Sequence, residues 1–414
     1  MTADSALNQS SPAGGSEWRR GWPIVLTSMV GVGTGAVVYQ YVASLFITAL
    51  EAEYGWSRGQ VMTIGALALA GAFSAPFMGR IADRYGIRLV AISSILIVTM
   101  AYLGLAASDG SMAQIIPLMV IFGLAAPGTA GIVYARAIAS WFVTHRGMAL
   151  GLMSSGISIS VLIFNTPIAW LIDTHGFRAA YVALALLALC IGLPVVWRGL
   201  RLNPDEPQDA ATAGLSPAER PVVPLLSILV QPRFWLLVGT MALFNMPSAG
   251  ILTQLAPLLE GRGLTLVQGG LLFSLFTASV LAGRLLVGWA FDRYSPPHIA
   301  SIVAFAAGFG ILSFLDAAPV IALIPGIIAV GLVQGSESDV VAYFIGRMFP
   351  TASFSTVYGL TMTGTMTGTA IGIIAFGRLY DHYGDYHVPL LIGAGLFFLV
   401  SAMYLTMLRY FRQP

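Results

Sequence analysis

The chain has 414 residues, 57% of them hydrophobic and 9% charged, and its formal net charge at pH 7 is +2. A water-soluble fold of this size cannot bury so much apolar surface, so the composition excludes a soluble globular protein and favours one that lies in lipid. It offers no basic surface for nucleic acid. The single cysteine, Cys190, excludes an intrachain disulfide and a cysteine metal site.

Twelve apolar runs are long enough to cross a bilayer, which takes about 20 residues per helix. The runs are continuous and lack the alternation of a barrel strand, so we expect helices. The predicted fold class is an all-α integral membrane protein with twelve transmembrane helices in two six-helix repeats. The runs are 22–48, 58–79, 88–107, 112–138, 147–172, 178–198, 233–258, 266–290, 297–316, 319–345, 356–378 and 388–411.

These runs divide the chain into four parts. Residues 1–21 are rich in Ser, Ala and Gly and predict a disordered cytoplasmic tail without a signal peptide. Two six-helix bundles follow, at 22–198 and 233–411. Between them the chain turns polar and rich in proline, so we expect 199–232 to be a cytoplasmic linker.

The arginines predict the orientation, because all 20 basic side chains are arginine. When successive loops are assigned alternately to the two sides, most arginines lie on the side of the two termini. Positive charge marks the cytoplasmic side, so we expect both termini in the cytoplasm of a multi-pass inner-membrane protein. We also expect this protein to be a monomer. The arginines of the opposite side are Arg58, Arg178, Arg262 and Arg378.

The first run carries Tyr39, Gln40 and Tyr41 at membrane depth. Polar groups there usually face protein or water. They either line a cavity, as candidate substrate-binding residues, or bond to a neighbouring helix, and the sequence leaves both alternatives open.

A charged loop follows the second run and contains Gly79, Asp83, Arg84 and Arg88. Its first three positions recur 209 residues later as Gly288, Asp292 and Arg293. The loop resembles the signature G-x-x-x-D-R-x-G-x-R of the major facilitator superfamily. The resemblance implies two parallel six-helix repeats and a gating role for these residues, with Asp83 latching the halves together.

Two further strings resemble the monocarboxylate porter and oxalate/formate antiporter branch of that superfamily. They are 53–58, reading Glu-Tyr-Gly-Trp-Ser-Arg, and 141–152, in which His145 replaces the first arginine of the branch motif. Arg136, near the cytoplasmic end of the fourth run, is expected to form a structural or gating ion pair rather than to contact substrate. The lysines that members of this branch use for substrate are absent, which favours a monoanion over a dianion such as oxalate.

Three charges lie deep in the apolar runs, where charges are costly: Arg284, Glu337 and Asp339. Arg284 is about 12 Å along its helix from Asp292, and Glu337 is about 15 Å from Arg347, so their depths match. By resemblance, Arg284 corresponds to the arginine that the branch uses for substrate. Alternatively it pairs with one of the two carboxylates.

Glu337 and Asp339 are two residues apart and point about 200° apart on a helix, so they cannot share one task. We assign the proton to Glu337, with Asp339 as the alternative. Asn245, a polar side chain of the seventh run, is a further candidate for substrate binding.

The sequence therefore predicts a secondary transporter of a small organic anion, with a monocarboxylate favoured, coupled to a proton or to a counter-substrate. An exporter of lipophilic or neutral molecules is the alternative, and a non-transporting sensor is a third reading. The histidines lie in loops or at the ends of runs, and no nucleophile or metal cluster appears, so an enzyme, a cofactor and a metal site are not expected.

Overall fold

The computed structural model describes residues 14–56, 64, 67–204, 224–264, 266–315 and 319–411, and these residues are almost entirely helical. The all-α prediction is confirmed. The first half contains α1 (Gly14–Gly33), α2 (Val37–Tyr54), η1 (Leu67–Ala70), α4 (Gly71–Tyr85), α5 (Ile87–Ala107), α6 (Met112–Ala125), η2 (Ala126–Thr129), α7 (Gly131–Trp141), α8 (Arg146–Leu186), η3 (Leu187–Gly192) and α9 (Leu193–Gly199). The second half contains α10 (Leu225–Leu229), α11 (Pro232–Gly261), α12 (Leu266–Arg293), α13 (Pro296–Leu312), η4 (Val320–Ala322), α14 (Leu323–Met348), η5 (Thr351–Ser353), α15 (Phe354–Tyr383), α16 (His387–Thr406) and α17 (Leu408–Phe411).

Eight helices of the described residues are long and apolar enough to cross a membrane, or nine if the bent pair of α1 and α2 is one span. One of the eight, the 54-residue segment Arg146–Gly199, is too long for a single crossing. It is interrupted at Gly176, where φ is 79°, a backbone conformation that glycine adopts without strain. This segment therefore supplies both the fifth and the sixth predicted spans. The second span is described only in its later part, as η1 and α4, and the ninth is the 17-residue α13.

The N-terminal helix starts earlier than the sequence predicts. Helix α1 begins at Gly14, inside the segment expected to be a disordered tail, whereas residues 1–13 lie outside the described residues. The physical reason is a contact of Glu17, which is only 7% exposed. Its carboxylate accepts hydrogen bonds from the backbone N–H groups of Val143, Thr144 and His145, which ties the start of α1 to the loop before α8.

Of the predicted linker, residues 205–223 lie outside the described residues.

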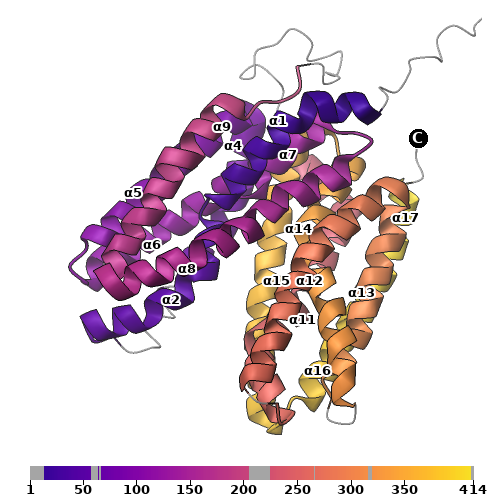
Figure 1. Cartoon of the computed structure of the whole chain (residues 1–414). Coiled ribbons are helices and arrows are strands. Elements are labelled where there is room, and N and C mark those ends of the chain that lie inside the picture. Colours follow the sequence, from indigo (N-terminus) through magenta and orange to yellow (C-terminus); the bar gives the residue numbers. More distant parts are fainter. Residues whose placement is uncertain are drawn as a thin grey trace, which may run out of the picture.

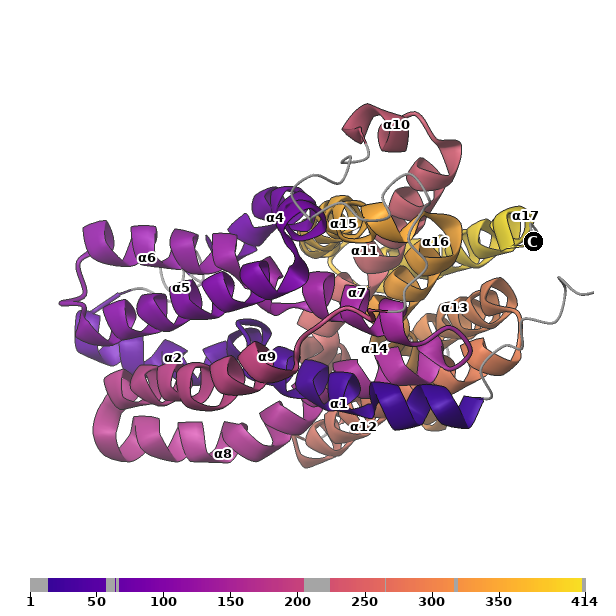
Figure 2. The ribbon, with the colours of Figure 1, turned by 90° about the horizontal axis from the view of Figure 1, so that it is seen from above.

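The helices form two bundles that correspond to the two halves of the chain. Figure 1 shows the bundles inclined to one another, close together near α7 and α14 and further apart toward α2 and α16. Seen from above in Figure 2, α4 lies beside α15 on one side and α12 beside α8 on the other. The halves therefore meet along two helix pairs, each with one helix from either bundle.

Both helix pairs cross at glycines that leave no room for a side chain. A Cβ on Gly79 of α4 would clash with the carbonyl of Ser355 at the start of α15. In the other pair, a Cβ on Gly288 of α12 would clash with the carbonyl of Gly147 at the start of α8. Gly79 and Gly288 are 209 positions apart and Gly147 and Ser355 are 208 apart, so the repeat predicted from the sequence is present in the structure.

Candidate functional site

Asp83, at the last turn of α4, binds the beginning of α15 in the other half. Its Oδ1 accepts a hydrogen bond from Ser355 N at 3.1 Å, and its Oδ2 accepts from Thr356 N and Thr356 Oγ1, both at 2.7 Å. The first N–H groups of a helix have no partner within the helix and carry partial positive charge. A carboxylate placed there satisfies two of them and holds the halves together.

Asp292 makes the matching contact in the other helix pair. Its Oδ1 accepts from Gly147 N at 2.7 Å and its Oδ2 from Met148 N at 2.8 Å, at the start of α8. Each aspartate thus binds a helix of the opposite half. We call the end of the molecule that holds Asp83 and Asp292 the latch end.

The exposed arginines of the repeated loops contact residues of their own halves. Arg84 lies over the ring of Tyr85, with 5.3 Å to the centroid, and Arg293 over Trp289 at 4.3 Å. Arg88 donates a hydrogen bond to the carbonyl of Trp197. Among the charged residues of the repeated loops, the aspartates are therefore the ones that contact the opposite half.

Two buried arginines also lie near the latch end. Arg136 of α7 is 7% exposed and close enough to Asp83 to interact with its charge. Arg146 lies within the string 141–152 and was not singled out from the sequence, yet it contacts the opposite half. Its Nε donates to Phe142 O at 3.0 Å and its Nη1 to Gly346 O of α14 at 2.9 Å. The carbonyls it binds lie at the ends of helices, where a cation is favoured.

A cavity of about 210 Å³ lies between the two bundles and is lined by both. The first half contributes mainly apolar side chains together with Tyr41 and Ser154. The second half contributes Arg284 of α12 and the polar side chains Gln334, Glu337 and Ser338 of α14. The charged side chains of the cavity therefore come from one half only.

Arg284 is 6% exposed, and its Nη1 donates to the carbonyl of Ser154 at 2.6 Å. Within the described residues, no ion pair of 4.0 Å or less joins Arg284 to Glu337 or Asp339. In this conformation Arg284 is thus not the partner of either carboxylate, as the sequence had left open.

The backbone of Arg284 forms part of a helix crossing. Its carbonyl lies against Gly151 of α8, and the carbonyl of Ala75, 209 residues earlier, lies against Gly359 of α15 in the same way. Ala75 also lines the cavity. The first half therefore has a methyl group where the second half has a guanidinium.

The two carboxylates of α14 point in different directions, as their spacing predicts. Glu337 lines the cavity, and its Oε2 accepts a hydrogen bond from Gln334 Nε2 at 3.1 Å. Asp339 is 1% exposed and faces α8, where its Oδ1 accepts from Ser154 Oγ at 2.7 Å. Only Glu337 is placed to meet a molecule in the cavity.

The remaining candidate substrate-binding residues differ in whether they line the cavity. Tyr41 lines the cavity and is 51% exposed, whereas the side chain of Gln40 lies outside the described residues. Tyr39 points away from the cavity, into a buried aromatic cluster, and its hydroxyl lies 3.2 Å from that of Tyr181. Asn245 is buried, bonds to Met241 O at 3.0 Å and lies beside Glu337 without being part of the cavity lining. Of the tyrosine pair, only Tyr41 can meet a bound molecule.

Residues 26–372 match the Major Facilitator Superfamily, which accounts for most of the chain. The chain belongs to this superfamily. It is a multi-pass membrane transporter and not an enzyme.

Two relatives and one solved structure illustrate the similarity. The chain is 28% identical over 340 residues to the probable nitrate/nitrite transporter NarK2 of Mycobacterium tuberculosis (strain H37Rv), covering 78% of this chain and 80% of that protein. It is 24% identical over 400 residues to monocarboxylate transporter 13 of Rattus norvegicus, covering 94% and 89%. A crystal structure of the superfamily transporter FucP in the outward conformation matches the fold with a TM-score of 0.73 at 15% identity, covering 94% of this chain and 98% of that one.

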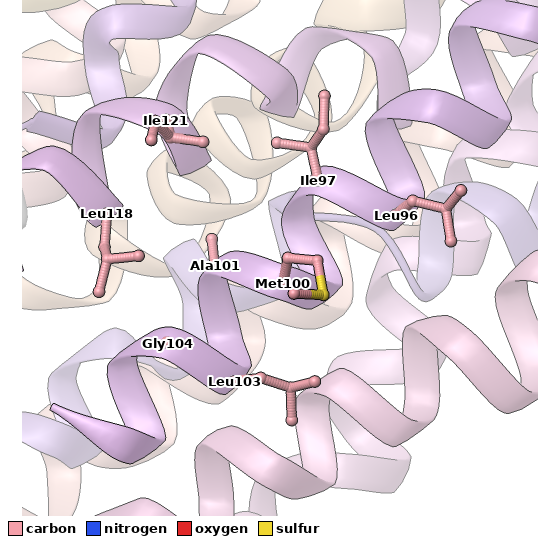
Figure 3. Close-up of a pocket in the computed structure, with 8 residues that line it drawn as sticks. All are labelled: Leu96, Ile97, Met100, Ala101, Leu103, Gly104, Leu118 and Ile121. Atoms are coloured by element: carbon pink, nitrogen blue, oxygen red, sulfur yellow. The ribbon is translucent and has the colours of Figure 1, made fainter.

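A second hollow lies on the outer face of the first bundle, between α5 and α6, and measures about 710 Å³ (Figure 3). Its lining is apolar, and Met100, Leu96 and Ile121 are 66%, 41% and 47% exposed. In a superfamily transporter this face contacts lipid, so an open apolar groove there is expected. It has no polar group that could orient a solute.

Asp83→Asn is expected to slow transport while leaving substrate binding nearly unchanged. The amide loses the charge that favours the start of α15, where a charged hydrogen bond contributes about 1.5 to 3 kcal/mol. The contact between α4 and α15 therefore forms less often, whereas Asp292 still holds α8 against α12 beside the cavity, so Kd is little affected. Initial uptake rate and Kd, measured on the same preparation, check this prediction. Asp109→Asn, at an exposed loop between α5 and α6, is the matched control. An equal loss of uptake and binding would show that Asp83 is needed for folding instead.

Proposed function

We propose that the protein is a secondary active transporter that moves a small organic monoanion, with a monocarboxylate favoured, across the inner membrane by alternating access. The observation that carries this proposal is the placement of Arg284. Its guanidinium lines a cavity between the two halves and is paired with neither nearby carboxylate. A guanidinium presents parallel N–H groups that match two oxygens of a carboxylate.

The size of the cavity favours a small substrate. Sites for drug-sized ligands measure about 300 to 1,000 Å³, and this cavity measures about 210 Å³. An exporter of large lipophilic compounds therefore fits the cavity less well than a carrier of a small anion does.

The similarity to transporters of nitrate and of monocarboxylates supports the same class. Nitrate and a carboxylate group are both planar monoanions that can offer two oxygens side by side. One arginine can bind either of them with two parallel hydrogen bonds. Glu337, the acid that lines the cavity, is the residue we propose for proton coupling in symport, and exchange for a second anion is the alternative.

Uptake into liposomes that contain the purified protein tests the proposal. Radiolabelled lactate, benzoate and nitrate are compared with the neutral sugar fucose and a cationic dye, with protein-free liposomes as the control. We expect uptake of at least one of the two carboxylates and competition by the other. Uptake of the dye or the sugar, with none of the anions, would contradict the proposal.

We further propose that the latch end and both termini face the cytoplasm, as the distribution of arginines indicates. After Cys190→Ser, single cysteines at positions 84, 178, 293 and 382 are treated in whole cells with an impermeant thiol reagent. Only positions 178 and 382 should react. Reaction at 84 or 293 would reverse the orientation.

A further inference from the structure

Ser154 of α8 connects two charged side chains of the other half. Its carbonyl accepts a hydrogen bond from Arg284 Nη1 at 2.6 Å, and its hydroxyl donates to Asp339 Oδ1 at 2.7 Å. All three residues are buried, with 2%, 6% and 1% of their surfaces exposed. Among the described residues, neither Arg284 Nε nor Asp339 Oδ2 has a hydrogen-bond partner. A cation and an anion, each with one polar atom unpaired, therefore contact the same residue of the opposite half.

Arg284 and Asp339 lie at the same level on adjacent helices. Helices α12 and α14 are parallel, because their contacts advance together along both, from Gly331 against Phe276 to Tyr343 Oη, which donates to Phe291 O at 3.1 Å. Gly335 of α14 packs against the carbonyl of Val280 in α12. Arg284 and Asp339 are each four residues further on, about one turn. If Ser154 did not lie between them, the long arginine side chain could reach the carboxylate.

The position of Ser154 depends on the latch. Ser154 is six residues beyond Met148, whose N–H binds Asp292, so it lies about 9 Å along α8 from that contact. Opening of the latch end separates α8 from α12, and Ser154 moves with α8. Arg284 and Asp339 both stay with the second half.

We propose that Ser154 is a spacer, which keeps Arg284 and Asp339 apart while the latch end is closed and lets them form an ion pair when it opens. A buried charge without a partner is costly, so the two side chains pair once the spacer leaves. This inference rests on the proposed function, in which Arg284 binds the anion. Asp339 then competes with the anion for Arg284, so the site binds tightly with the latch closed and releases its substrate with the latch open.

Binding of radiolabelled benzoate to the purified full-length protein tests the spacer. Ser154→Ala keeps the carbonyl that binds Arg284 but frees Asp339, so Kd should rise at least threefold. Asp339→Asn removes the competitor, so Kd should fall and efflux from preloaded liposomes should slow. The double variant should behave like Asp339→Asn alone. Ser155→Ala is the matched control, since this neighbouring buried hydroxyl donates only to Leu152 O, at 2.7 Å.

If Asp339 served only to hold α8 and α14 together, both substitutions would remove the same hydrogen bond, so each would weaken binding or leave it unchanged, and their effects would not add. That result would overturn the spacer while leaving the proposed substrate class intact.

A measurement without ligand tests, independently of the substrate, whether Arg284 and Asp339 pair when the latch is open. Thermal unfolding is recorded for Arg284→Met, Asp339→Asn and their combination, in the wild-type chain and in a chain with Asp83→Asn and Asp292→Asn. Neighbouring residues give non-additive effects. The difference between the Tm change of the double variant and the sum of the two single changes should be larger by about 2 °C or more in the chain with Asp83→Asn and Asp292→Asn. Equal non-additivity in both backgrounds would overturn the spacer, whereas absent binding of any anion by the wild type would overturn the proposed function.

Discussion

Arg284→Lys is expected to weaken binding of a monocarboxylate by about 1.5 to 3 kcal/mol, the contribution of a charged hydrogen bond. Lysine keeps the positive charge but loses the planar fork that binds two oxygens at once. Its shorter reach also removes the bond to the carbonyl of Ser154. Isothermal titration of the purified variant measures the change directly.

The matched control is Arg378→Lys, because Arg378 is an exposed arginine of α15 that is absent from the cavity lining. Its Kd should equal that of the wild type. If Arg284→Lys also left Kd unchanged, the guanidinium would not be the anion site. A drop in protein yield without a change in Kd would indicate a structural role at the crossing with α8.

Glu337→Gln is expected to abolish accumulation of substrate driven by a proton gradient while retaining binding and exchange. A charged carboxylate in a dry cavity is unfavourable, and the nearby Arg284 cation compensates for this. An anion bound to Arg284 removes that compensation, so Glu337 takes up a proton more readily. By reciprocity, protonation favours binding of the anion. Glutamine resembles the protonated acid and keeps this affinity without carrying a proton.

The measurement compares the final concentration ratio across proteoliposomes with an imposed proton gradient and the rate of exchange without one. Glu53→Gln, at an exposed ion pair with Arg178, is the control. Asp339→Asn should change rates but keep the final ratio. If Asp339→Asn loses the ratio and Glu337→Gln keeps it, the two roles are reversed. If both keep it, protons are not coupled through α14.

The repeats of the sequence predicted much of the fold, because a repeat is a local pattern that needs no knowledge of contacts. The matched aspartates Asp83 and Asp292 are 209 positions apart, and the helix starts that they bind are 208 positions apart. The opposite directions of Glu337 and Asp339 follow from helix geometry alone, and the structure shows them.

What the sequence could not predict are contacts between distant residues. Ser154 is one small polar residue in a long apolar run, and only the packing of α8 against α12 and α14 gives it two charged partners. The sequence left open whether Tyr39 lines a cavity or bonds to a neighbouring helix. Its contact with Tyr181, 142 residues away, shows that it bonds to a neighbouring helix. The helix over residues 14–21 was not predicted from the sequence, because the loop at residues 143–145 that Glu17 binds is also far away in the sequence.

If Arg284 binds the anion, as proposed, the contrast between Ala75 and Arg284 at equivalent crossings means that the second bundle carries the substrate. An anion held by Arg284 would keep its position relative to the second bundle, and the first bundle, which lines the cavity without a charged side chain, would move past it. During a transport cycle, the distance from the anion to α12 then stays constant while its distances to α4 and α7 change. The first bundle would thus move relative to the bound anion, and the second bundle would keep its contacts with it.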